Sequence, residues 1–165
     1  MESIFLFKVK YIKDKSLAEF NYKLIHSLLS NNLLISKWDK TITNKCKLCR
    51  DEIENAKHLI FDCGNVQHIW KIASTCINFT ITWKRIVIGF YFENNELSTI
   101  YNYFISFIAF RIYKCKMYCR VVQVKETNDY VIRSIKEYFS EHCQVLKRLR
   151  RTKEQKLFHH LVSNL

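Results

Sequence analysis

The sequence predicts an all-α, mainly helical protein, because residues that interrupt helices are almost absent from it. The 165 residues include no proline and only two glycines. Average usage would supply roughly eight prolines and about eleven glycines in a chain of this length. β-Sandwiches and β-barrels need many tight turns, so this composition favours long helices with short connections. Apolar residues make up 48% of the chain, which is enough to form a sizeable core.

A first helix is predicted over residues 17–30. Ser16 and Glu19 have the spacing of a capping box, in which Ser16 caps the helix and Glu19 reaches back to it. Apolar residues then recur every three or four positions, and the pattern resumes over residues 33–37. Residues 39–57 are polar and rich in charge, which indicates a loop.

Three more helices are predicted further along the chain from the same periodicity. One begins near Asn65, and another covers residues 95–118. The last begins at Asn128 or Asp129, both of which are suitable helix caps. Its apolar stripe over residues 131–149 is typical of a core helix or of a short coiled-coil seam.

The charge of the chain is strongly positive. It contains 27 lysines and arginines against 15 aspartates and glutamates, a net charge of +12. This surplus favours a polyanionic partner, either nucleic acid or an anionic membrane surface. The excess is concentrated in the second half, since residues 71–165 hold 16 basic and 7 acidic side chains. We expect one region over residues 1–78 and a basic helical region over residues 79–165 that packs on it.

No membrane role is expected. The most apolar stretch, residues 100–113, is interrupted by Asn102, Ser106 and Arg111, and it is shorter than the roughly 20 residues that span a bilayer. No secretory signal is recognisable in the sequence. Seven cysteines without such a signal indicate thiols that stay reduced inside the cell and that favour metal binding over disulfides.

Four residues have the spacing of a metal site, in the pattern Cys46-x2-Cys49-x8-His58-x4-Cys63. Zinc binds thiolates at about 2.3 Å and imidazole nitrogen at about 2.0 Å in a tetrahedral arrangement. Three cysteines and one histidine leave no open coordination position, so we expect a structural Zn²⁺ in a small zinc-knuckle-like loop between the first two long helices. Two alternatives remain. One is a pair of buried thiols with an unrelated histidine, and the other is a catalytic Cys–His pair, for which the sequence offers no orienting group.

The residues around this motif carry a resemblance to a known family. The helical segment Phe20–Leu29 precedes the Cys-x2-Cys pair, Glu54–Cys63 contains the sequence His-Leu-Ile-Phe-Asp-Cys, and Val66–Trp70 closes the pattern. Over residues 5–75 this arrangement resembles the zinc-binding region that follows the polymerase domain in reverse transcriptases of non-LTR (LINE-type) retrotransposons. The similarity is weaker in two segments further along the chain.

The resemblance implies a C-terminal accessory segment of an element-encoded polymerase, which helps to hold template RNA and target DNA. The chain contains no Tyr-x-Asp-Asp polymerase motif, and its 15 carboxylates are scattered rather than grouped as in a nuclease. We therefore expect no enzymatic activity. The chain would be a cut-out domain or a stand-alone relic of a reverse transcriptase.

Three groups of basic residues are predicted to contact phosphates. The first flanks the metal motif, the second alternates with aromatic residues in the helix predicted over residues 95–118, and the third is a basic tail. The alternatives are a core position for the second group and a solvated helix end for the third. In order, the groups are Lys37, Lys40, Lys45, Lys47 and Arg50; Arg111, Lys114, Lys116 and Arg120; and Lys147, Arg148, Arg150, Arg151 and Lys153.

The leading functional hypothesis is non-catalytic binding of RNA, or of single-stranded or nicked DNA, through phosphate contacts in the nucleus. No small-molecule substrate is expected, and a second copy of the chain or the remainder of a reverse transcriptase are further partners. The alternative is a helical, zinc-stabilised protein-interaction scaffold, a domesticated or decayed retroelement fragment that uses the stripe over residues 131–149 as an oligomer seam. Without zinc, we expect local disorder of residues 38–64 rather than global unfolding.

Overall fold

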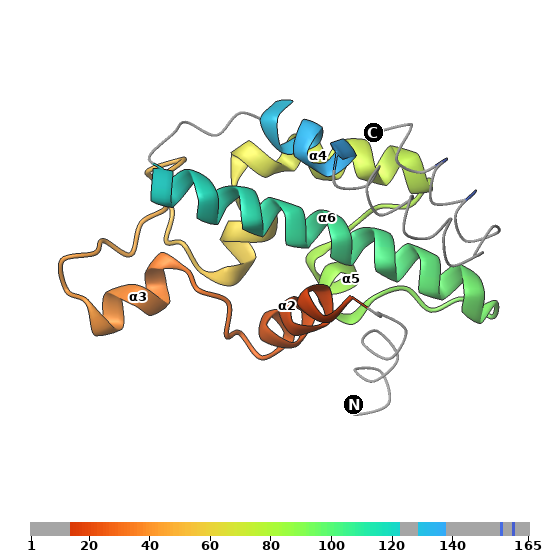
Figure 1. Cartoon of the computed structure of the whole chain (residues 1–165), viewed down its shortest axis with the longest axis horizontal. Coiled ribbons are helices and arrows are strands. Elements are labelled where there is room, and N and C mark those ends of the chain that lie inside the picture. The colour runs from red at the N-terminus through yellow and green to blue at the C-terminus, as the bar shows by residue number, and fades with distance from the viewer. Residues whose placement is uncertain (1–13, 123–128, 138–155, 157–159, 161–165) are drawn as a thin grey trace.

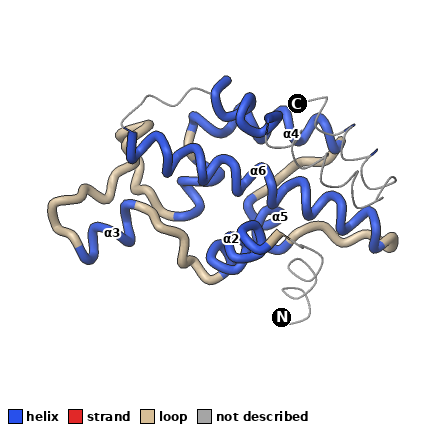
Figure 2. Tube along the Cα trace, in the orientation of Figure 1, coloured by secondary structure: helices blue, strands red, loops and turns tan. Residues whose placement is uncertain are grey.

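The computed structural model describes residues 14–122 and 129–137 together with Lys156 and His160. Helices dominate this part of the chain, which contains no β-strand and only an isolated antiparallel bridge between Lys45 and Ile53 (Figure 2). The helices are α2 (Lys15–Ile25), α3 (Asn32–Trp38), the π-helix η1 (His58–Asp62), α4 (Gly64–Ile77), α5 (Trp83–Ile88) and α6 (Asn95–Val122). The predicted all-α class is therefore confirmed.

The long helix α6 is the centre of the fold and runs through the middle of the molecule (Figure 1). Helices α2 and α5 contact each other and α6, while η1 contacts both α6 and α4. Phe104, Ile105 and Phe107 in the middle of α6 are at most 1% exposed, so the core surrounds this helix. No helix among the described residues combines the length and the apolar composition that crossing a bilayer requires.

The helix predicted from Asn128 or Asp129 is present over residues 129–137. It packs on the same core through Val131 and Ile135, which are both buried. Its predicted continuation from residue 138 onward lies outside the described residues. The buried residues of the two predicted regions form one core, and the division of the chain between them stays a prediction.

The predicted cap of the first helix is wrong. Asp14, not Ser16, is the N-cap of α2, and its carboxylate accepts a hydrogen bond from the backbone N–H of Leu17 at 3.1 Å. Glu19 does not reach back, because its carboxylate pairs with Lys23 one turn later at 2.6 Å. A carboxylate satisfies the same N–H groups as a hydroxyl and also interacts favourably with the positive end of the helix dipole.

Helix α2 also ends earlier than predicted, at Ile25 instead of residue 30. Ser27 has a left-handed backbone with φ of 56°. The N–H of Leu28 donates to the carbonyl of Lys23 at 2.7 Å, and the two features together form a Schellman motif. Glycine is the usual residue at the left-handed position, so a serine there gives no sequence signal for the end of the helix.

Helix α5 and the turn after it lie just after residue 78, where the sequence indicated only the boundary between two regions of the chain. Gly89 ends α5 with φ of 100°, and a Cβ at this position would lie 2.6 Å from Oδ1 of Asn102. The side chain of Asn102 holds the turn, because Oδ1 accepts from the N–H of Phe90 at 2.6 Å and Nδ2 donates to its carbonyl at 2.9 Å. Asn102 interrupts the apolar run of α6. Its side chain forms the hydrogen bonds that the buried backbone N–H and carbonyl of Phe90 would otherwise make with a β-strand.

Candidate metal centre

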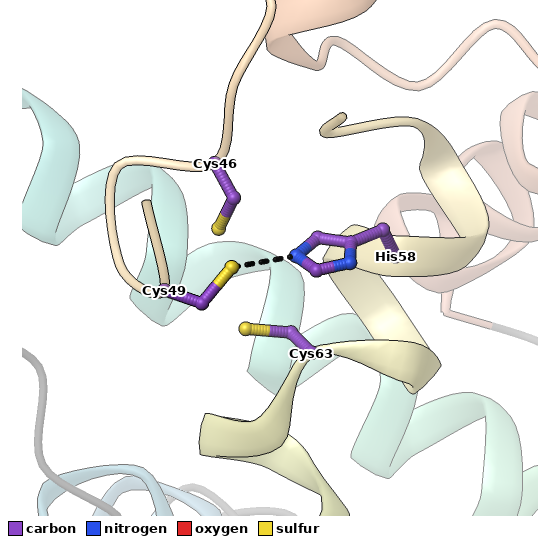
Figure 3. A group of neighbouring side chains, drawn as sticks. All are labelled: Cys46, Cys49, His58 and Cys63. Carbon is purple, nitrogen blue, oxygen red and sulfur yellow. Dashed lines mark hydrogen bonds between the residues drawn. The ribbon is translucent and has the colours of Figure 1, made fainter. Parts of the chain in front are cut away.

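The four predicted ligands converge although they come from two separate segments. The sulfurs of Cys46, Cys49 and Cys63 and a ring nitrogen of His58 all lie within 4.8 Å of one another. Figure 3 shows their side chains pointing toward a common centre. Tetrahedral zinc would hold its sulfur ligands about 3.8 Å apart and a sulfur and a nitrogen about 3.5 Å apart. Sγ of Cys49 is 3.4 Å from Nε2 of His58, so small side-chain movements would close the site on the ion.

Cys46 and Cys49 lie in a narrow hairpin that the backbone closes on both sides. The N–H of Cys46 donates to the carbonyl of Glu52, and the N–H of Glu54 donates to the carbonyl of Asn44, both at 2.9 Å. These bonds fix the position of the two sulfurs relative to the rest of the loop. The segment that the sequence indicated as a loop is therefore ordered by its own hydrogen bonds as well as by its ligands.

The turn between the two cysteines directs backbone N–H groups at a sulfur. The hydrogen bond with Cys63 and burial raise the pKa of the Cys46 thiol, and the N–H groups of Cys49 and Leu48, which both donate to its Sγ, oppose this rise. The residue after the turn, Arg50, adopts a left-handed backbone with φ of 66°. N–H donors that face a sulfur stabilise its thiolate form, which is the form that binds metal.

His58 and Cys63 lie at the two ends of η1. Oδ1 of Asn55 accepts from the N–H of His58 at 2.8 Å, and the N–H of Cys63 donates to the carbonyl of His58 at 3.1 Å across a π-helical turn. The wide turn brings residues five positions apart onto one side of the segment. Nε1 of Trp70 in α4 donates to the carbonyl of Ile60 at 2.7 Å and fastens this segment to the next helix.

The charges around the site favour an anionic metal cluster. A hydrogen bond between the thiols of Cys63 and Cys46 lowers the pKa of Cys63 to about 6 and raises the pKa of Cys46 to about 12. The ammonium group of Lys116 on α6 also lowers the pKa of Cys63. Lys116 is only 3% exposed, and its Nζ has no hydrogen-bond partner within the described structure. Zinc with three thiolates would carry about −1, which the buried Lys116 would offset.

The residues fit structural zinc and not a catalytic site. Cys46, His58 and Cys63 are buried and Cys49 is half-buried, so all four donors face the interior. Four protein ligands complete the tetrahedral shell of Zn²⁺ and leave no position for water or substrate. The ion would join the hairpin to η1 and α4 and thereby fix the loop between α3 and η1.

A buried carboxylate anchors the same loop to α6. Glu54 is 2% exposed and pairs with Arg120, while its Oε1 also accepts from the N–H of Asn32 at the start of α3. Its backbone carbonyl accepts from the N–H of Leu33 at 3.1 Å. In the sequence, Glu54 is only one residue of the polar, charge-rich segment 39–57. Glu54 and Arg120 are 66 positions apart, so local patterns carry no signal for their pairing.

The basic residues predicted to flank the metal motif all lie on the surface, and they form what we call the basic loop. These residues are Lys37, Lys40, Lys45, Lys47 and Arg50. The predicted basic tail lies outside the described residues. The residues of this tail are Lys147, Arg148, Arg150, Arg151 and Lys153.

The basic residues predicted on α6 do not form a common surface. Lys114 is exposed, but Lys116 is buried beside the cysteines and is not accessible to a phosphate. Arg111 and Arg120 are half-buried. The guanidinium of Arg111 donates to Ser134, and that of Arg120 is held by the buried carboxylate described above.

Comparison with known proteins agrees with this site. No curated protein and no solved structure matches the chain. A protein family, however, matches the segment that contains α2, α3, the hairpin, η1 and the first half of α4, with all four ligands and Trp70 inside it. Residues 6–70 match the family described as zinc-binding in reverse transcriptase.

Proposed function

We propose that this zinc-stabilised region binds nucleic acid without catalysing a reaction, as an accessory region derived from the reverse transcriptase of a non-LTR retrotransposon. The proposed ligands are RNA and single-stranded or nicked DNA. The match of residues 6–70 to a zinc-binding region, and not to a catalytic domain, supports a non-enzymatic role. We also propose a nuclear location, where target DNA is found.

The observation that carries the proposal is the basic loop itself. From residue 37 to residue 50 there are five basic residues and a single acidic residue, Asp39. All five basic side chains are exposed. The acidic Asp51 and Glu52 that follow them are also exposed, whereas Glu54 is buried and pairs with Arg120. Zinc and the hairpin bonds hold the backbone of the loop, so these charges keep a fixed arrangement that can match a row of phosphates.

The backbone of Arg50 gives a second, independent argument. Its φ of 66° lies in the left-handed region, where a residue with a side chain is about 1–2 kcal/mol less stable than in its ordinary conformation. Glycine would relieve this strain, and the side chain of Arg50 is exposed and forms no part of the core. An exposed arginine retained at a position that favours glycine supports a role for its charge in binding.

The mechanism is electrostatic. Lysine and arginine side chains that neutralise phosphates release condensed counterions, so the affinity falls as salt rises. For a single strand, the slope of log K against log salt is about −0.7 per phosphate, and five contacts would give a slope of about −3.5. Nothing in this mechanism requires recognition of particular bases.

Fluorescence anisotropy of the full chain with labelled single-stranded RNA and DNA of random sequence tests the proposal. The test variant replaces Lys45, Lys47 and Arg50 by glutamine, and a matched control replaces three other exposed lysines by glutamine. These control positions are Lys71, Lys84 and Lys136. We expect the loop variant to reduce the magnitude of the salt slope by about 2, and the control variant to leave it nearly unchanged.

Other results would contradict the proposal. Binding that does not depend on salt, or equal losses in the loop and control variants, would refute phosphate contacts by the basic loop. An absence of nucleic-acid binding together with concentration-dependent self-association in size-exclusion chromatography would instead support the protein-interaction scaffold.

A further inference from the structure

Trp38 is unusual among the large side chains of this protein. It is the last residue of α3 and is 88% exposed, the highest value among the exposed large hydrophobic residues of the described structure. The other two tryptophans are Trp70, which is 2% exposed, and Trp83, which is half-buried against the core. Tryptophan offers the largest apolar surface of any side chain, and folding normally covers most of it.

The residues beside Trp38 in the sequence are charged, with two basic side chains and one acidic. Lys37 precedes it, Asp39 and Lys40 follow it, and all three are exposed. The carboxylate of Asp39 accepts from the N–H and the hydroxyl of Thr41. Nζ of Lys40 donates to the carbonyl of Ser36 at 3.3 Å, which keeps the ammonium group beside the last turn of α3. Trp38 is therefore an exposed aromatic surface with a lysine before it and a lysine two positions after it in the chain.

Helix α3 is held by hydrogen bonds to the loop that contains the metal ligands. Its cap Asn31 accepts from the N–H of Leu34 at 3.0 Å, and Glu54 accepts from the N–H of Asn32 at 3.0 Å. Nδ2 of Asn32 also donates to the carbonyl of Lys45 at 2.7 Å, so the helix and the basic loop form one unit. Figure 1 shows α3 at the edge of the molecule, away from α4 and α5. Its C-terminal end thus presents Trp38 outward.

We propose that Trp38 stacks on an unpaired base of a single-stranded nucleic acid while Lys37 and Lys40 contact the flanking phosphates. The proposal rests on the proposed function and narrows its ligand to single strands, because bases in a duplex already stack on each other. Aromatic platforms between basic residues are the usual means of holding single strands, and they tolerate any base because every base has a π-face. An apolar protein partner that covered Trp38 would also remove water from the two lysines and leave their charges without compensation. Phosphates would pair with these charges.

The test compares two labelled single strands of equal length, an oligothymidylate and an abasic oligonucleotide with the same number of phosphates. Wild type is expected to bind the oligothymidylate more tightly than the abasic strand. Trp38→Ala should weaken binding of the oligothymidylate by about 5- to 100-fold and leave the abasic strand unchanged, while Trp38→Phe should retain most of the affinity. The matched control is Tyr91→Ala, which removes an aromatic side chain that is 44% exposed before α6 and should change neither affinity.

Each other outcome has a distinct meaning. If Trp38→Ala binds both strands like wild type, base stacking by Trp38 is refuted and the phosphate mechanism stands. If neither strand binds to any variant, the proposed function fails, and this inference fails with it. If Trp38→Ala leaves nucleic-acid binding intact but abolishes self-association in analytical ultracentrifugation, the side chain serves a second copy of the chain and the proposal is wrong. Zinc content and far-UV circular dichroism of each variant verify that the fold is retained.

Discussion

The ion pair between Glu54 and Arg120 allows the sharpest prediction about how the metal loop is held. Glu54 is 2% exposed, and its carboxylate pairs with Arg120 and accepts from the N–H of Asn32. Arg120→Met would remove the positive charge and leave the hydrogen bond from Asn32. Removing one partner of a buried pair typically destabilises a protein by about 3–5 kcal/mol, because the other charge stays buried without compensation. The side chain of Arg120 is 17% exposed, so solvent screens this pair only weakly.

The double variant Glu54→Gln/Arg120→Met separates the contribution of the ion pair to stability from that of the packing of the two side chains. Glutamine keeps an oxygen that can accept from the N–H of Asn32, and it carries no charge that needs a partner. We therefore expect the double variant to be more stable than Arg120→Met alone, with a coupling of about 2 kcal/mol or more between the two positions.

Urea unfolding in excess zinc measures these differences. With a dependence of about 2 kcal/mol per molar urea, Arg120→Met should lower the unfolding midpoint by about 1.5–2.5 M. Amide hydrogen exchange should accelerate first at Asn32 and Leu33, whose N–H groups bond to Glu54. A loss below about 1 kcal/mol for Arg120→Met, or simple additivity in the double variant, would refute the claim that this pair anchors the loop.

Substitutions at three further positions test other features of the structure. Lys116→Met should weaken zinc binding by about 10- to 100-fold in competition with a chelator, because it removes the buried cation beside the cysteines, whereas Lys116→Arg should retain more of the affinity; equal affinities would contradict this. Gly89→Ala should lower stability by about 2 kcal/mol or more in thermal denaturation, since its Cβ would meet Asn102 at 2.6 Å and its φ is 100°; an unchanged transition temperature would show that the turn adapts. Arg50→Gly should raise stability by about 0.5–1 kcal/mol in urea while weakening nucleic-acid binding; a loss of stability would contradict the argument from backbone strain.

The metal centre was the most predictable part of this protein. A site of four ligands needs specific residue types at short spacings, so Cys46, Cys49, His58 and Cys63 could be recognised without knowledge of the fold. The helices were also predictable, because apolar residues that repeat every three or four positions leave a strong pattern over lengths such as that of α6.

The ends of the helices were less predictable, because this chain uses residues other than glycine in left-handed positions. Ser27 after α2 and Asn78 after α4 both have positive φ, at 56° and 54°. Helix α5 is only six residues long, which is too short for periodicity to reveal. The cap Asp14 was missed because Ser16 offered a complete capping box two residues later.

The direction of the basic side chains on α6 could not be predicted from the sequence. Lys114 and Lys116 are two positions apart, yet one is exposed and the other is buried beside the cysteines. Their difference depends on how α6 packs against η1, a contact between segments about 50 positions apart in the chain. The exposure of Trp38 could not be predicted either, because large apolar residues are normally expected in the interior of a fold.

The most direct test of the account is the zinc content of the full chain by native mass spectrometry. We predict one zinc per wild-type chain, and no zinc after Cys46→Ser or Cys63→Ser. Cys76→Ser, which changes a half-buried cysteine outside the cluster, should retain the ion. On chelation, amide exchange should accelerate over residues 38–64 while α6 stays protected. A wild-type chain without bound metal, or one that keeps its zinc after either ligand is replaced, would contradict the assignment of this site.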